Sequence, residues 1–325
     1  MSDSAAAVLT ALSHQERILM ITHATPDGDS AGSALALGLA LEREGRTVEW
    51  VSWDGVPERL RFLPASDRVK EWAAVDWGTF NAAVAVDCGH QSRLAAPEDF
   101  WTKGPTLINI DHHPGNPLFG SVNWVDDQAS STGELVVELF RRAGWVPTRD
   151  EALCLYTAIS TDTLSFRQVN ATLKTLEAVH WLISAAQLDM AWANRLVWDS
   201  RPEGEVRFLG WALGSVEMSA DGRLAWIAVP RAAMVRYGVD DSGVDTVVHH
   251  LLSIAGVDIA FLVREGDQPD RVKVSWRAKS PYDVGTVAQT FGGGGHRYAA
   301  AAQLESTLEE AVEAVKKSLG AVPRV

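Results

Sequence analysis

Residues 17–30 read RILMITHATPDGDS, an apolar run that ends in a histidine, two aspartates and a serine. The stretch Ser30–Glu44 predicts a helix that Gly45 ends. Further short apolar runs follow at Thr47–Trp53, Asn81–Cys88 and Thr106–Asp111. Apolar runs separated by helical segments indicate parallel strands covered by helices on both faces. The sequence therefore predicts an α/β domain built on a doubly wound, mostly parallel sheet.

Histidines and aspartates stand where these strands are expected to end. Ligands of open parallel sheets bind beyond the carboxyl ends of the strands. One further acid, Asp162, is expected at the C-terminal end of a helix, where its charge opposes the helix dipole. The candidate residues are His23, Asp27, Asp29, Asp87, Asp111, His112, His113 and Asp162.

Each candidate alone has an ordinary explanation, since Pro26-Asp27-Gly28 is a common turn sequence and paired histidines often lie on surfaces. Together, so many carboxylates on one sheet edge would repel each other unless cations were bound. Imidazole and carboxylate ligands without thiolates favour Mn²⁺, with Mg²⁺ or Co²⁺ as alternatives. The number of ligands favours two ions about 3.5–4 Å apart that share one carboxylate.

The second half of the chain begins a new pattern. Strands are expected at Leu224–Pro230, Ile259–Glu265 and Arg271–Arg277, and helices at Val244–Ile254, Tyr282–Phe291 and Leu308–Leu319. In the first half, Ser131–Glu134 forms a capping box, and Asp150 and Asn170 are the expected caps of two later helices. These patterns predict a catalytic domain at 1–190, a linker at 191–215 and a smaller α/β domain with a mixed sheet at 216–325.

Composition narrows the classes of function. The chain has 325 residues, a formal net charge of −13 and two cysteines. A negative field of this size disfavours long duplex nucleic acid, and too few cysteines remain for a disulfide framework. No signal peptide or membrane-length apolar run is expected, so the sequence favours a cytosolic, membrane-free protein. The oligomeric state stays open, a homodimer included.

The motifs resemble those of the DHH phosphoesterase family. They are His23-x-x-x-Asp27-x-Asp29-Ser30, Asp87 in Val-Asp-Cys-Gly, Asp111-His-His, Thr161-Asp-Thr and, in the C-terminal domain, Gly292-Gly-Gly-Gly-His296. The resemblance extends over positions 23–296 in the order that the family has. Within the family, the chain is most similar to stand-alone oligoribonucleases that degrade nanoRNA and dephosphorylate pAp. The resemblance implies an active site in the cleft between the two domains.

The resemblance also implies roles for individual residues. His23, Asp27 and Asp87 would bind the first metal, and Asp29, Asp87, His112 and Asp162 the second. His113 would face the substrate phosphate, and Asp111 would orient a histidine. Leu164 departs from the family, whose members often have glycine after Thr-Asp-Thr, which puts the local loop shape in doubt.

In the second domain, a phosphate site is expected around the glycine run. The backbone N–H groups of Gly293, Gly294 and Gly295 could form an anion-binding nest, and His296 adds charge. Arg277, at a strand end, is implied as a bidentate phosphate clamp. The neighbouring Trp276 should face the opposite side of its strand and belong to the core.

The expected function is hydrolysis of short RNA to mononucleotides and removal of the 3′-phosphate of pAp to give AMP. The alternatives are an inorganic pyrophosphatase, a phosphodiesterase acting on cyclic or linear dinucleotides, and a non-catalytic nucleotide sensor. A pyrophosphatase of this architecture would carry a Ser-Arg-Lys-Lys type motif, where this chain has only Ser275-Trp-Arg-Ala-Lys279. A sensor would be expected to have lost metal ligands, and every ligand is present here.

Overall fold

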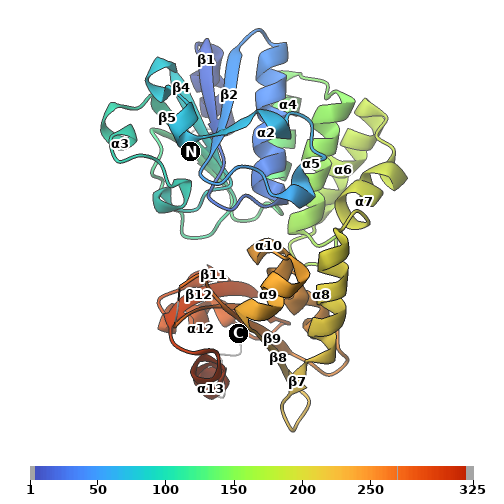
Figure 1. Cartoon of the computed structure of the whole chain (residues 1–325). Coiled ribbons are helices and arrows are strands. Elements are labelled where there is room, and N and C mark those ends of the chain that lie inside the picture. The colour runs from blue at the N-terminus through green and yellow to red at the C-terminus, as the bar shows by residue number, and fades with distance from the viewer. Residues whose placement is uncertain (1–3, 269, 320–325) are drawn as a thin grey trace. The chain divides into compact units, whose positions relative to one another are not determined.

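The computed structural model describes residues 4–268 and 270–319. Contacts divide the chain into two compact units, Met1–Ser200 and Arg201–Val325 (Figure 1). Among the described residues, no helix is both long enough and apolar enough to cross a lipid bilayer.

Unit 1 contains a six-stranded sheet in which every recorded pairing is parallel. The strand order is β3-β2-β1-β4-β5-β6, so the chain reverses direction across the sheet between β1 and β4. This is the doubly wound sheet that the sequence predicts. The strands are β1 Arg17–Ile21, β2 Thr47–Ser52, β3 Val69–Glu71, β4 Ala82–Val86, β5 Thr106–Asp111 and β6 Val122–Val125.

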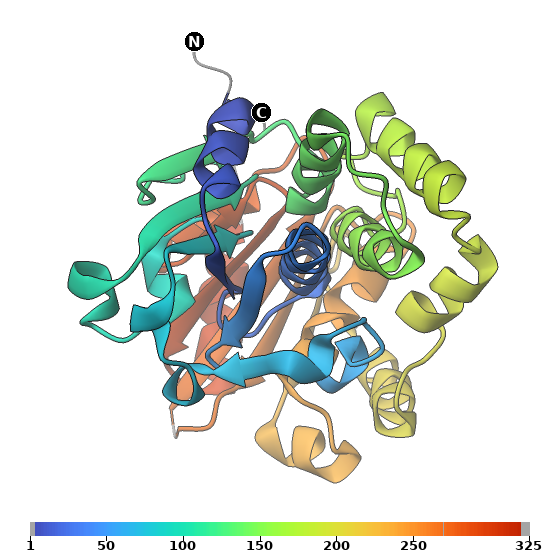
Figure 2. The same cartoon turned by 90° about the horizontal axis from the view of Figure 1, so that it is seen from above.

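Both faces of this sheet are buried, which explains why its strands are apolar without alternation. Ile18 and Met20 of β1 pack into the core beneath the helices, and Leu19 and Ile21 pack into a second core on the other face. Helices α2, α4 and α5 lie side by side (Figure 2), and their buried residues belong to the first of these cores. The helices of unit 1 are α1 Ser4–Ser13, α2 Gly28–Arg43, α3 Phe100–Lys103, α4 Thr132–Ala143, α5 Arg149–Asp162, α6 Leu173–Ala186 and α7 Met190–Trp198.

Glycines allow α2 to lie directly against α5. A Cβ at Gly32 would clash with the backbone carbonyl of Cys154, and a Cβ at Gly28 would clash with the Thr161 side chain. Since Gly28 and Asp162 are the first residue of α2 and the last of α5, this close packing brings the two chain segments of the site together.

Gly32→Ala is expected to destabilise unit 1 by about 1–3 kcal/mol, because the added methyl group must displace backbone. Gly210→Ala in helix α8 (Glu203–Gly214) is the control, since a Cβ there meets nothing within 4 Å. The control should gain about 0.5–1 kcal/mol from helix propensity. Equilibrium unfolding in urea measures both changes, and equal stability of the two variants would contradict this account of the packing.

Unit 2 contains a mixed sheet in the order β11-β12-β10-β9-β8-β7. Only the β8–β9 pairing is parallel among those recorded. One face packs against α12 and α13, and the other against α8, α9 and α11. The strands are β7 Glu217–Met218, β8 Leu224–Val229, β9 Ile259–Glu265, β10 Arg271–Ala278, β11 Gly294–His296 and β12 Ala299–Glu305. The helices are α8 Glu203–Gly214, α9 Arg231–Tyr237, α10 Asp241–Asp245, α11 Val247–Leu252, α12 Val284–Thr290 and α13 Leu308–Leu319.

The structure corrects several local predictions. Thr148, rather than Asp150, caps α5 through a reciprocal capping box with Glu151, and Thr172, rather than Asn170, precedes α6. The predicted helix at 244–254 is divided into α10 and α11. The boundary between units falls inside the predicted linker 191–215, but most of that interval is helical because α7 and α8 each bury apolar residues in their own unit.

Candidate metal centre

The loops and helix ends at the carboxyl edge of the unit 1 sheet carry the predicted ligands. Asp27 caps α2, because its Oδ1 accepts the backbone N–H groups of Asp29 and Ser30 at 3.1 and 3.0 Å. Asp87 directly follows β4 in a left-handed conformation with φ of +57°, which turns the chain sharply at the strand end. Asp111 ends β5, and Asp162 ends α5 as the sequence predicts.

The predicted ligands come together around Asp87. Its Oδ2 lies 3.6 Å from His23 Nε2, which is itself 3.9 Å from Asp27 Oδ1. Its Oδ1 lies 3.5 Å from His112 Nε2. The two oxygens of one buried carboxylate therefore face two different histidines, as a bridging carboxylate between two cations requires.

His112 gathers the second group of carboxylates. Its Nε2 lies 3.7 Å from Asp29 Oδ2 and 3.8 Å from Asp162 Oδ2, besides its approach to Asp87. Asp162 reaches this position although the chain after it is unusual. Leu164, Ser165 and Phe166 have φ of +46°, +57° and +63°. Leu164 thus adopts a left-handed conformation that glycine would take more easily, and Asp162 still lies beside His112.

Asp29 is also anchored to the start of α4. It accepts the backbone N–H groups of Thr132 and Gly133 at 2.7 and 2.8 Å. The hydroxyl of Thr132 donates to Asp87 Oδ1 at 3.2 Å. These donors belong to the first turn of a helix, where the helix dipole favours negative charge. Ser131 caps α4 by accepting the backbone N–H of Glu134 at 3.1 Å, but the predicted capping box is only half formed, because Glu134 Oε2 accepts from Ser130 instead. The first turn that Ser131 caps holds two of the carboxylates.

Burial and repulsion among the carboxylates perturb their protonation. Burial, with the charge of Asp27, raises the pKa of Asp87 to about 7. Burial and the charge of Asp87 raise the pKa of Asp29 well above its usual value. Burial alone would lower the pKa of His112, but Asp162, Asp29 and Asp87 raise it to about 9. A cluster that favours protons this strongly has a deficit of positive charge.

The donor set suits hard divalent cations. Three compact groups of potential ligands occur among the described residues of unit 1, and each of them contains Asp87. They are His23, Asp27 and Asp87; Asp29, Asp87 and His112; and Asp87, Asp111 and His113. These ligands are carboxylate oxygens and imidazole nitrogens, the donors from which the sequence analysis inferred Mn²⁺. Cys88 adds no thiolate to them, because its Sγ donates to the backbone carbonyl of His90.

The sequence analysis did not identify Asn116, which orders the third group. Its side-chain amide donates to Asp111 Oδ2 at 2.7 Å and to Asn109 Oδ1 at 2.8 Å. Asp111 Oδ1 in turn lies 2.8 Å from His113 Nδ1. Burial would raise the pKa of Asp111, but these bonds from His113 and Asn116 lower it overall. The contacts of Asp111 with His113 and Asn116 thus give its predicted orienting role a geometric basis.

The first ligand loop is held by a second residue that the sequence analysis did not identify. Thr25 has φ of +55°, and its backbone N–H donates to both carboxylate oxygens of Asp54 at 2.8 and 2.9 Å. Asp54 follows β2, the neighbour of β1 in the sheet. It therefore fixes the turn that presents His23 and Asp27.

In unit 2, the predicted phosphate residues lie along neighbouring strands. Arg277 of β10 and His296 of β11 both pair with Ala299 of the intervening β12. Trp276 is fully buried, as predicted. The glycine run also meets steric demands of the hairpin. A Cβ at Gly293 would clash with the carbonyl of Ala301, whereas Gly294 is exposed with nothing within 4 Å.

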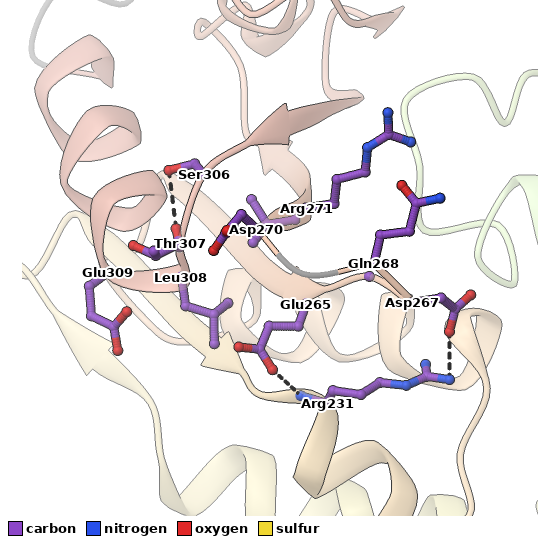
Figure 3. A pocket seen from close by; sticks show the side chains of 12 residues that line it. Arg231, Glu265, Asp267, Gln268, Asp270, Arg271, Ser306, Thr307, Leu308 and Glu309 are labelled. Carbon is purple, nitrogen blue, oxygen red and sulfur yellow. Dashed lines mark hydrogen bonds and ion pairs between the residues drawn. The ribbon is translucent and has the colours of Figure 1, made fainter.

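A cavity of about 410 Å³ lies elsewhere in unit 2 (Figure 3). It opens beside the start of β10 and the first turn of α13, whereas Arg277 is near the other end of β10. Its lining mixes charges, as in the ion pair of Arg231 with Asp267 at 2.6 Å. None of the predicted site residues lines it, so we assign it no part in catalysis.

Two protein-family models match this chain. The model of the DHH family N-terminal domain matches residues 17–159, and the DHHA1 domain model matches residues 228–321. The chain therefore belongs to the DHH family of metal-dependent phosphoesterases.

Individual relatives resemble nearly the whole chain. The bifunctional oligoribonuclease and PAP phosphatase NrnA of Thermus thermophilus is 31% identical, covering 93% of this chain and 90% of the relative. The protein of the same name from Bacillus subtilis is 28% identical over 92% of this chain and 93% of its own. An exopolyphosphatase-related protein from Bacteroides fragilis shares the fold, with a TM-score of 0.88 at 23% identity, covering 98% of this chain and 96% of its own.

Proposed function

We propose that this phosphoesterase hydrolyses short RNA oligonucleotides to mononucleotides and removes the 3′-phosphate of pAp. The observation that carries the proposal is Asp87, whose two oxygens face His23 at 3.6 Å and His112 at 3.5 Å. The names of the Thermus and Bacillus relatives, similar along nearly their full lengths, support the choice of substrates.

In this proposal, His23, Asp27 and Asp87 hold one divalent cation, and Asp29, Asp87, His112 and Asp162 hold the other. Mn²⁺ is the proposed metal because the ligands are imidazoles and carboxylates. When bound, such cations lower the pKa of water and neutralise charge on phosphoryl oxygens. No donor in the set is a thiolate, so a structural zinc site is not part of the proposal.

The residues beside the metal ligands orient the substrate and move protons. Asp111 holds His113 through Nδ1 at 2.8 Å, so a contact with phosphate would be made through Nε2. Such a contact would stabilise charge on a phosphoryl oxygen or protonate the departing sugar oxygen. The burial of Asp111 and His112 keeps bulk water from competing for these positions.

We further propose that unit 2 binds a terminal phosphate through Arg277, Gly293–Gly295 and His296. Arg277 carries a planar guanidinium suited to two parallel hydrogen bonds with phosphate. The surface-exposed Gly294 leaves room for a ligand near this strand.

Arg277→Ala is expected to raise KM about 10- to 100-fold while changing kcat much less, because a charged hydrogen bond contributes about 1.5–3 kcal/mol. Arg271→Ala is the matched control. It removes another arginine of β10, which is exposed and forms an ion pair with Glu305 of β12. Steady-state kinetics with pAp and a trinucleotide RNA measure both. A KM of Arg277→Ala equal to that of the control would contradict the clamp.

A direct assay distinguishes the proposed function from its alternatives. Purified protein with Mn²⁺ is incubated with end-labelled RNA of two to ten nucleotides, pAp, cyclic dinucleotides and pyrophosphate in parallel. The proposal predicts the highest rates with pAp and the shortest RNA. Faster hydrolysis of pyrophosphate or of cyclic dinucleotides would contradict the proposal and favour the pyrophosphatase or the dinucleotide phosphodiesterase. Inactivity toward all of these substrates would favour the nucleotide sensor.

A further inference from the structure

Arg93 brings a positive charge to the metal centre from an accessible loop. It belongs to the short 3₁₀ helix η5, Gln91–Leu94, which follows the Asp87 loop. Its Nη2 lies 3.3 Å from Nδ1 and 3.4 Å from Nε2 of His23. Its backbone carbonyl accepts the N–H of Ala24 at 2.7 Å, which ties the two loops together. The residue is exposed, whereas His23 is buried.

The hydrogen bonds of His23 show which ring nitrogen a cation would use. Nδ1 lies 2.8 Å from the carbonyl oxygen of Ala24, which can only accept, so Nδ1 carries the proton. The lone pair is then on Nε2, the nitrogen that also faces Asp87 Oδ2. The guanidinium of Arg93 contacts both ring nitrogens, and its Nη2 lies 3.4 Å from Nε2, the nitrogen that would ligate the first metal.

A bound cation at Nε2 changes what Arg93 can contact. A cation bound there would take the nitrogen lone pair, so the guanidinium would lose that acceptor and face a like charge. Two cations remain close only when an anion lies between them, because their direct repulsion is strong in a partly buried site. A phosphoryl oxygen is an anion of the required kind, and the planar guanidinium suits it.

The charge balance of the site gives a second reason. Five aspartates, when ionised, exceed the charge of two divalent cations by one negative unit, and a phosphodiester brings another. The positive charge of Arg93 beside His23 therefore favours binding of an anionic substrate.

We propose that Arg93 binds a nonbridging oxygen of the scissile phosphate on the His23 side of the metal centre. The proposal rests on the proposed phosphoesterase reaction and adds a substrate-contacting residue to it. The rival explanation is structural, in which Arg93 only neutralises carboxylates while no cation is bound. Both explanations predict that Arg93→Ala alters the protein. They differ in whether phosphate binding and kcat/KM remain reduced once Mn²⁺ saturates the metal sites.

The test compares Arg93→Ala, Arg93→Lys and the control Arg61→Ala, which removes an exposed arginine paired only with Glu58 in the recorded ion pairs. Calorimetry measures binding of Mn²⁺ alone, then binding of inorganic phosphate to the Mn²⁺-saturated proteins. Kinetics at saturating Mn²⁺ use pAp, dinucleotide RNA and bis(p-nitrophenyl) phosphate, a generic phosphodiester.

For Arg93→Ala we expect Mn²⁺ affinity equal to or above that of the wild type, at least tenfold weaker phosphate binding, and kcat/KM lower by about 10²–10³-fold. Arg93→Lys should recover part of the loss. Normal phosphate binding and kcat/KM in Arg93→Ala would overturn the proposal, as would a loss that arises wholly from weakened Mn²⁺ binding. If the wild type hydrolyses none of the three substrates, the proposed function fails, and the phosphate titration still decides on Arg93.

Discussion

Replacing Asp87 with asparagine is expected to reduce hydrolysis by at least about 10³-fold, since both metal positions lose their shared ligand. Asparagine is preferred to alanine because residue 87 has φ of +57°, a conformation that asparagine tolerates well. Its side-chain oxygen can still accept from Thr132. Asp87→Ala should lose activity equally, but it adds backbone strain to the loss of the ligand.

The same substitution should stabilise the cation-free protein. The pKa of Asp87 is raised to about 7 in the fold from an ordinary value near 4, so ionisation of this group opposes folding. That cost grows as pH rises from about 4 to 7 and is complete at pH 8. Thermal unfolding at pH 8 in EDTA should therefore give a higher Tm for Asp87→Asn than for wild type, with a smaller difference at pH 5.

Asp67→Asn, at an exposed position in the same unit, controls for the general effect of removing one negative charge. It should retain full activity. If Asp87→Asn keeps more than a tenth of wild-type kcat/KM at saturating Mn²⁺, the assignment of Asp87 as the shared ligand is wrong. Loss of activity with a lower Tm in EDTA would instead indicate damage to the fold.

Removal of the cations is the second change with a large expected effect. EDTA should abolish hydrolysis, and excess Mn²⁺ should restore it, because the proposed reaction requires a cation at each of the two positions. A ligand present at 100 times its dissociation constant stabilises the folded state by about 2.7 kcal/mol. For a unit of this size, the Tm of wild-type protein should then rise by roughly 5–10 °C on adding Mn²⁺.

The Asp87→Asn protein provides the control for this shift. It retains the other ligands but should lose most of the Mn²⁺-dependent rise in Tm. An equal rise in both proteins would place the stabilising cation outside the cluster. No rise in the wild type, with activity unaffected by EDTA, would exclude a metal-dependent reaction.

The parallel sheet and the convergence of the ligands were predictable because both depend on strand order. Apolar runs without alternation indicated buried parallel strands, and His23, Asp87 and His112 each follow such a run. Parallel strands end at one edge, so their trailing residues meet there. Asp162 needed an additional argument, its unfavourable place at a helix C-terminus, and the structure puts it 3.8 Å from His112.

The residues that sequence reasoning missed act through long-range contacts. Asn116 bonds to Asp111 from an irregular loop, and Arg93 approaches His23 from 70 positions away. Neither has a local pattern that distinguishes it from a surface residue. The caps of α5 and α6 were misplaced for a different reason, because several Asp, Asn and Thr residues near each helix start are equally suitable by type.

The glycine run shows how one motif can meet two demands. Flexibility for phosphate binding was the reason inferred from sequence, and this remains part of the proposal. The structure adds that Gly293 approaches β12 too closely for a side chain and that Gly295 has φ of +138°. Of the three glycines assigned to the phosphate site, only Gly294 lacks a steric reason of this kind.

The central claim is that two cations share Asp87, and anomalous diffraction from crystals grown with Mn²⁺ tests it most directly. Two manganese peaks are predicted about 3.5–4 Å apart, one beside His23 and Asp27 and the other beside Asp29, His112 and Asp162, with Asp87 contacting both. A single peak, or two peaks that do not share Asp87, would contradict the account.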